Sequence, residues 1–121
     1  MKKLIIVLVL LLAATALFGQ SIQIGSFPPG KWLDSKYDAI WEFSASGLRI
    51  LDSNTGNEVW NFSGKTIQNF AVAPGRQTEM TFSCPEAGRS YSFKAAGTDG
   101  DVVMVIKRDG LNDYTVTMKK Q

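Results

Sequence analysis

The chain has 121 residues, with 13 Lys and Arg against 11 Asp and Glu, and it contains no histidine and a single cysteine. The missing imidazole excludes the usual general base and every Ser-His or Cys-His nucleophilic pair, and with a lone thiol it also excludes ordinary zinc sites. We therefore expect a protein that is not an enzyme and that has neither a metal site nor a cofactor.

The N-terminal residues have the pattern of a secretory signal peptide. Lys2 and Lys3 precede an apolar run over residues 4–18, and small residues follow this run. The run is shorter than the roughly 20 residues that a membrane span needs. We expect cleavage after Gly19, with cleavage after Ala16 as the alternative. Residues 1–19 are then the leader, and residues 20–121 form one exported domain, periplasmic or secreted, without a membrane span.

Removal of this leader changes the charge of the chain. Lys2 and Lys3 carry both surplus positive charges, so residues 20–121 contain equal numbers of acidic and basic side chains. A domain without a basic excess has no electrostatic footprint for nucleic acid or for an anionic membrane surface. We therefore expect no nucleic-acid partner.

The single cysteine, Cys84, has no partner for an internal disulfide. It alternates in phase with Met80 and Phe82, which predicts a buried thiol that packs like a small apolar side chain. The alternative, in an exported protein, is a disulfide with another chain.

Strand patterns dominate the chain beyond a proline-rich lead-in at residues 21–29, where Pro28-Pro29-Gly30 blocks both a helix and a central strand. From Tyr37 onward, apolar and polar side chains alternate with a period of two, and turn residues separate the alternating runs. Within residues 66–72 the alternation breaks at Ile67, which indicates a bulge or a short helical turn. The expected strands are, in chain order, 31–33, 37–43, 48–51, 58–62, 66–72, 78–84, 90–94, 102–106 and 114–118.

Eight to nine short strands separated by tight turns predict an all-β fold. Short connections favour an antiparallel up-and-down meander, and closing that meander into a barrel removes its exposed edges. We therefore expect a small closed barrel, with a β-sandwich as the alternative. A barrel of about eight strands has an interior that is either filled by side chains or holds one small ligand.

The aromatic residues have two interpretations. All of them except Phe18 lie beyond the leader, and most occupy the apolar phase of their strands. They form either a filled core or the lining of a pocket for a small apolar or amphipathic ligand. The candidate ligand-binding residues are Trp41, Phe43, Trp60, Phe62, Phe82, Tyr91 and Phe93.

One pair of carboxylates invites a metal interpretation. Asp99 and Asp101 flank Gly100. A calcium loop needs a denser, ordered run of oxygen ligands, so we expect a solvated turn at this place.

The start of the first strand, Gly30-Lys31-Trp32, resembles the Gly-x-Trp motif of the lipocalin and calycin superfamily. The resemblance covers roughly residues 30–120 and implies that Trp32 closes one end of a barrel beneath a cation from a late strand. Lys119 is the first candidate for that cation and Arg108 is the second. The chain departs from the family in being shorter, in lacking a second motif between middle strands, and in lacking helices after the first strand and at the C-terminus.

Two functional classes remain open. The resemblance implies a small exported lipocalin-like barrel that binds a small apolar or amphipathic molecule. The alternative is a non-enzymatic exported structural or interaction domain with a filled core, whose partner is another exported protein. A pocket of several hundred cubic ångströms favours the first class, and a filled barrel with an exposed apolar patch favours the second.

Overall fold

The computed structural model describes residues 21–121, so the expected leader and its cleavage sites lie outside the described residues. The described part of the chain contains nine strands and no helix, which confirms the predicted all-β fold. The strands are β1 Gly30–Asp34, β2 Ala39–Ser44, β3 Gly47–Asp52, β4 Glu58–Asn61, β5 Gln68–Ala73, β6 Thr78–Cys84, β7 Arg89–Ala95, β8 Val102–Arg108 and β9 Tyr114–Lys120.

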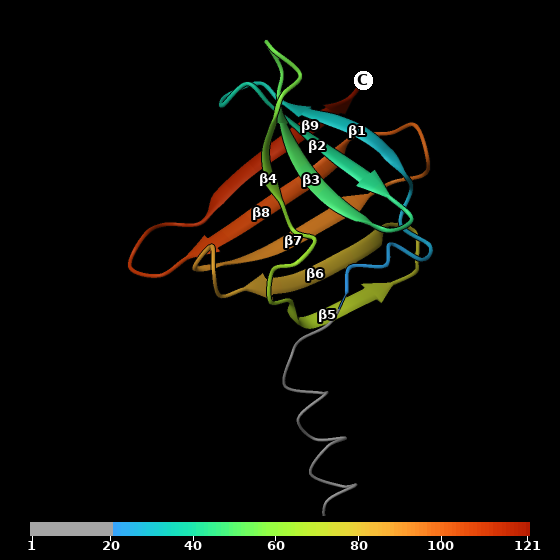
Figure 1. The fold of residues 1–121 in the computed structure, drawn as a ribbon. Coiled ribbons are helices and arrows are strands. Elements are labelled where there is room, and N and C mark those ends of the chain that lie inside the picture. The colour runs from blue at the N-terminus through green and yellow to red at the C-terminus, as the bar shows by residue number, and fades with distance from the viewer. Residues whose placement is uncertain (1–20) are drawn as a thin grey trace, which may run out of the picture.

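The strands form one antiparallel sheet in the order β4-β3-β2-β1-β9-β8-β7-β6-β5. Neighbours in sequence pair as the meander predicts, and the first strand also pairs with the last, with Trp32 opposite Lys120. The sheet curls strongly, as Figure 1 shows, so that its two halves face each other across the core. No ladder joins β4 to β5 in the described part of the chain, and the result is a half-barrel that is open between these two strands.

Irregularities in the sheet lie at the two strands that border this opening. The register shifts between Ile50 and Leu51 where β3 pairs with the short strand β4. It shifts again between Gln68 and Ala71 on β5, where Asn69 has a positive φ of 56°. The bulge predicted within residues 66–72 is therefore confirmed. Bulges bend a strand and increase its twist, and they leave backbone groups outside the ladder.

The lead-in before β1 contributes to the core, which its proline-rich sequence did not indicate. Ile22, Ile24 and Phe27 are buried, although their backbone belongs to no strand. The ring of Phe27 lies 4.8 Å from that of Phe43 on β2 and 6.4 Å from that of Phe93 on β7. Phe27 therefore connects the two halves of the sheet from inside.

Aromatic side chains fill the centre of the half-barrel. The ring of Phe93 on β7 lies 5.6 Å from Trp41 and 5.1 Å from Phe43, both on β2. Phe62, which follows β4, lies 5.3 Å from both Phe82 and Tyr91. These contacts cross from one half of the sheet to the other, so side chains close the space that the backbone leaves open between β4 and β5.

Cys84 is fully buried in this core, as its phase on β6 predicted.

None of the described residues form a helix that is long and apolar enough to cross a membrane. Residues 21–121 contain no group of three or more Cys, Asp or Glu side chains that could hold a metal ion.

Candidate functional site

Trp32 closes one end of the half-barrel and is completely buried. Its indole Nε1 donates a hydrogen bond of 2.9 Å to the carbonyl oxygen of Gly100. Gly30 has a φ of 146°, and a Cβ atom there would lie 3.2 Å from two ring carbons of Trp32. Both the backbone conformation and the close approach of the indole therefore require glycine at this position.

The cation over Trp32 is Lys120, so the expectation of Lys119, or of Arg108 in second place, is wrong. The Lys120 Nζ lies 5.6 Å from the centre of the Trp32 ring. Lys119 points away, is 70% exposed, and pairs with Asp101 at 2.6 Å. The reason is the period of two: Met118 on β9 faces the core, so Lys120 shares its face and Lys119 does not.

The turn after β7 holds the carboxylates that the sequence offered as a weak metal candidate. Asp99 pairs with Lys120 at 2.8 Å, and this hydrogen bond lowers the pKa of Asp99. Asp101 pairs with Lys119. These two ion pairs connect the turn to β9, so both carboxylates have structural partners.

The aromatic residues predicted to line a ligand pocket do not surround one cavity. Phe43, Phe62, Phe82, Tyr91 and Phe93 are buried and pack on one another in the core. The reason is the strong curl of the sheet, which brings the inward side chains of the two halves into direct ring contact. Trp60 is only half-buried, with the Lys65 Nζ 4.7 Å from the centre of its ring. Of the predicted set, Trp41 alone borders the pocket described next.

A pocket of about 290 Å³ lies at the end of the half-barrel opposite Trp32, and we call it the mouth pocket. It forms where β1 and β8 end and where β2, β7 and β9 begin. In an antiparallel meander these ends meet at the same rim of the sheet. The mouth pocket is lined by Asp34, Tyr37, Ala39, Trp41, Ile50, Arg89, Ile106, Arg108 and Tyr114.

Two hydrogen-bond donors in this lining have no partner among the described residues. One is the indole Nε1 of Trp41, whose side chain is only 4% exposed, and the other is the Nε of Arg108. The guanidinium of Arg108 is held at its other end, where an Nη donates to the carbonyl oxygen of Asn112 at 2.7 Å. A buried donor without a partner costs about 1–3 kcal/mol. Both nitrogen atoms have almost no solvent-accessible surface, so they lie within the wall and do not face the space of the pocket.

The one carboxylate in the lining is already bonded. Asp34 is 2% exposed. The hydroxyl of Tyr114 lies 2.9 Å from both of its oxygens and donates its one proton to this carboxylate, and the backbone N–H of Lys36 donates at 3.0 Å. Burial and the bond to Asp34 raise the pKa of Tyr114, so its hydroxyl stays protonated and continues to donate. The Lys36 Nζ lies 5.2 Å from the centre of the Tyr114 ring.

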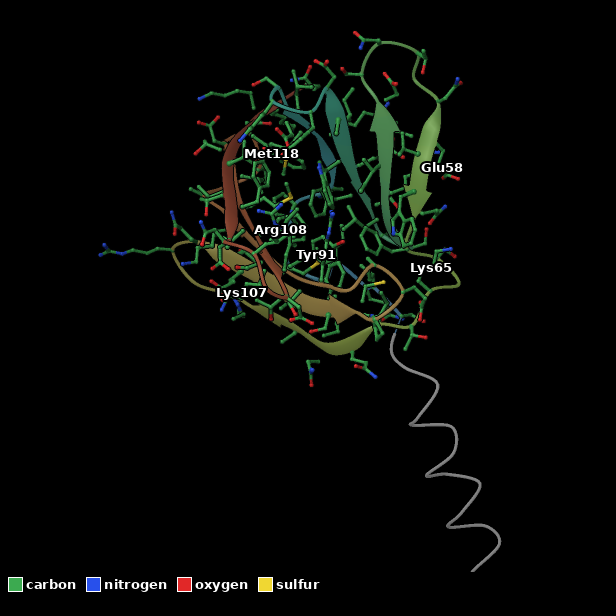
Figure 2. The ribbon with its side chains drawn as sticks, turned by 90° about the vertical axis from the view of Figure 1, so that its left-hand side faces the viewer. Glu58, Lys65, Tyr91, Lys107, Arg108 and Met118 are labelled. Atoms are coloured by element: carbon green, nitrogen blue, oxygen red, sulfur yellow. The ribbon has the colours of Figure 1, made fainter. Side chains whose placement is uncertain are left out.

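The opposite side of the pocket is cationic. Arg89 and Arg108 lie directly opposite each other on β7 and β8. Figure 2 shows Arg108 and Tyr91 within the space that the curled sheet encloses, whereas the neighbouring Lys107 is exposed. Burial raises the pKa of Tyr91 to about 12, and the nearby Arg89 opposes this effect. Neither guanidinium forms an ion pair with a carboxylate of the described residues.

No protein-family model, curated protein or solved structure matches this chain. The lipocalin-like resemblance therefore still rests on the motif at Gly30 and Trp32, and it stays a prediction.

Most residues that line the mouth pocket were not predicted from the sequence, although the sequence contains a pattern that indicates two of them. Arg89 precedes the inward-facing Tyr91 by two residues, and Arg108 follows the inward-facing Ile106 by two. The period of two thus places both arginines on the inner face at one rim. Charged residues at strand ends are normally assigned to turns, which is why this pattern was not used.

Proposed function

We propose that this chain is a small exported lipocalin-like barrel protein that binds an amphipathic small molecule in the mouth pocket. The observation that carries the proposal is the mouth pocket itself, which lies beside the packed aromatic core. At about 290 Å³ it has room for roughly ten water molecules. Aromatic and aliphatic side chains form its walls, and a few polar groups converge on it, which is the usual composition of a small-molecule site.

A small neutral compound with one aromatic ring, 3-phenylpropanamide, tests this proposal in a calorimetric titration. We expect saturable binding to the protein. Ala39→Leu places extra methyl groups in the pocket and should weaken binding by at least about tenfold, or about 1.4 kcal/mol. Ala71→Leu on β5 is the matched control, because Ala71 is exposed and lies outside the pocket. No binding to the folded protein, or equal binding to both variants, would contradict the proposal.

Export is the second part of the proposal, and it rests on the pattern of residues 1–19. N-terminal sequencing of the protein recovered outside the cytoplasm should give a start near Gln20, with Leu17 as the second choice. A soluble cytoplasmic product that retains Met1 would refute export without affecting the mouth pocket.

The alternative function, an exported interaction domain, is supported by the filled aromatic core and by exposed apolar side chains. Val59 on the edge strand β4 is 65% exposed, and Leu111 in the last turn is 64% exposed. These side chains lie on different segments of the chain, whereas an interaction surface usually needs a contiguous apolar patch. The mouth pocket is therefore the better supported site.

A further inference from the structure

The charged groups of the mouth pocket indicate what the pocket binds. Arg89 and Arg108 both line it, and neither guanidinium forms an ion pair with a carboxylate of the described residues. The carboxylate in the lining, Asp34, is already hydrogen-bonded to the Tyr114 hydroxyl and to the backbone N–H of Lys36. The two guanidinium groups therefore favour a ligand that presents an anionic acceptor.

The charges of the pocket lead to the same conclusion. Arg89 and Arg108 occupy facing positions on neighbouring strands, where like charges destabilise a sheet unless something lies between them. The lining contains these two cations and one carboxylate, and Lys36 lies nearby over the rings of Tyr37 and Tyr114. Asp109 follows Arg108 in an exposed turn, but no ion pair joins them. The pocket thus has a positive excess, and guanidinium groups match a carboxylate in geometry as well as in charge.

The depth of the pocket limits the rest of the ligand. Behind Trp41 the interior is filled, with the rings of Phe62 at 6.2 Å, Tyr91 at 5.9 Å and Phe93 at 5.6 Å from the indole. A long acyl chain has no space beyond these rings. The walls formed by Tyr37, Ile106 and Tyr114 suit an apolar group about the size of one aromatic ring.

We propose that the ligand is a small organic acid. Arg89 and Arg108 bind its carboxylate, and a single ring or a short branched chain packs against the aromatic walls. The inference rests on the proposed binding function and adds the chemical class of the ligand to it.

The test compares 3-phenylpropionate with its neutral amide, 3-phenylpropanamide, by calorimetric titration of the full mature protein. We expect the acid to bind at least about tenfold more tightly than the amide. Arg108→Gln and, independently, Arg89→Gln should remove this preference. Lys107→Gln should retain it, because Lys107 is an exposed neighbour that does not line the mouth pocket. Inorganic phosphate at the same concentration should not displace the acid, because phosphate gains nothing from the apolar walls.

Several results would overturn the assignment. Binding of 3-phenylpropionate that is no tighter than binding of its amide would overturn it. A preference for the acid that remains in both arginine variants would overturn it as well. Displacement by equimolar phosphate would indicate a general anion site instead of a site for an organic acid. The neutral amide separates these failures from that of the binding function: amide that binds as tightly as the acid leaves the pocket as a site for a neutral ligand, and a protein that binds neither compound refutes both proposals.

Discussion

Replacing Trp32 with alanine is expected to lower the free energy of unfolding by about 3–5 kcal/mol, the usual cost of truncating a large core aromatic side chain. The indole is completely buried and lies 5.5 Å from the ring of Phe43. The substitution also leaves the carbonyl of Gly100 without its hydrogen bond from Nε1. Because a domain of this size has a total stability of roughly 5–15 kcal/mol, urea denaturation should show a large shift of the midpoint.

Two lysine variants control for this effect. Lys120→Ala removes the cation over the Trp32 ring and should cost about 0.5–1 kcal/mol. Lys119→Ala should cost less, because the pair of Lys119 with Asp101 is exposed, and such pairs are worth about 0–1 kcal/mol. If Trp32→Ala shifts the midpoint no more than Lys119→Ala does, this end of the barrel is not closed by the indole.

Phe93→Ala is expected to destabilise the protein by a similar amount, about 3–5 kcal/mol. Phe93 has no exposed surface, and its ring contacts aromatic side chains from the lead-in, from β2, from β6 and from its own strand. Truncation at this position leaves a cavity between the two halves of the sheet, where neighbouring rings cannot move in without breaking other contacts. Thermal or urea unfolding of residues 20–121 measures the loss.

Leu111→Ala serves as the control for Phe93→Ala, since Leu111 is 64% exposed and its truncation should change stability by less than about 0.5 kcal/mol. Phe93→Leu should fall between the two, because leucine refills part of the space. A loss at Phe93 as small as that at Leu111 would mean that the centre of the half-barrel is not packed.

The strands themselves could be predicted because the alternation of side chains is local. The bounds of β6, residues 78–84, agree with the pattern of Met80, Phe82 and Cys84 on one face. The same rule places Lys120 in phase with Met118, so the cation over Trp32 was available from the sequence and was wrongly assigned to Lys119.

Other features depend on how distant strands approach each other, and no local pattern contains that information. The lead-in lacks periodicity, yet Phe27 packs between β2 and β7 once the sheet has curled. Whether the inward aromatics enclose a cavity depends on the same curl, which in this chain brings Phe62 against Phe82 and Tyr91, while the mouth pocket lies at one rim. The sequence therefore predicted which side chains face inward but not which of them border the mouth pocket.

The indole N–H resonances of residues 20–121 in a ¹H–¹⁵N correlation spectrum test the central claim, ligand binding at the mouth pocket, most directly. On titration with 3-phenylpropionate or with 3-phenylpropanamide, the signal of Trp41 should shift, because Trp41 lines the pocket. The signal of Trp32 should stay in place, because its N–H is bonded to Gly100 at the opposite end of the half-barrel. A Trp41 signal that does not move with either compound, or a Trp32 signal that moves in its place, would contradict the account.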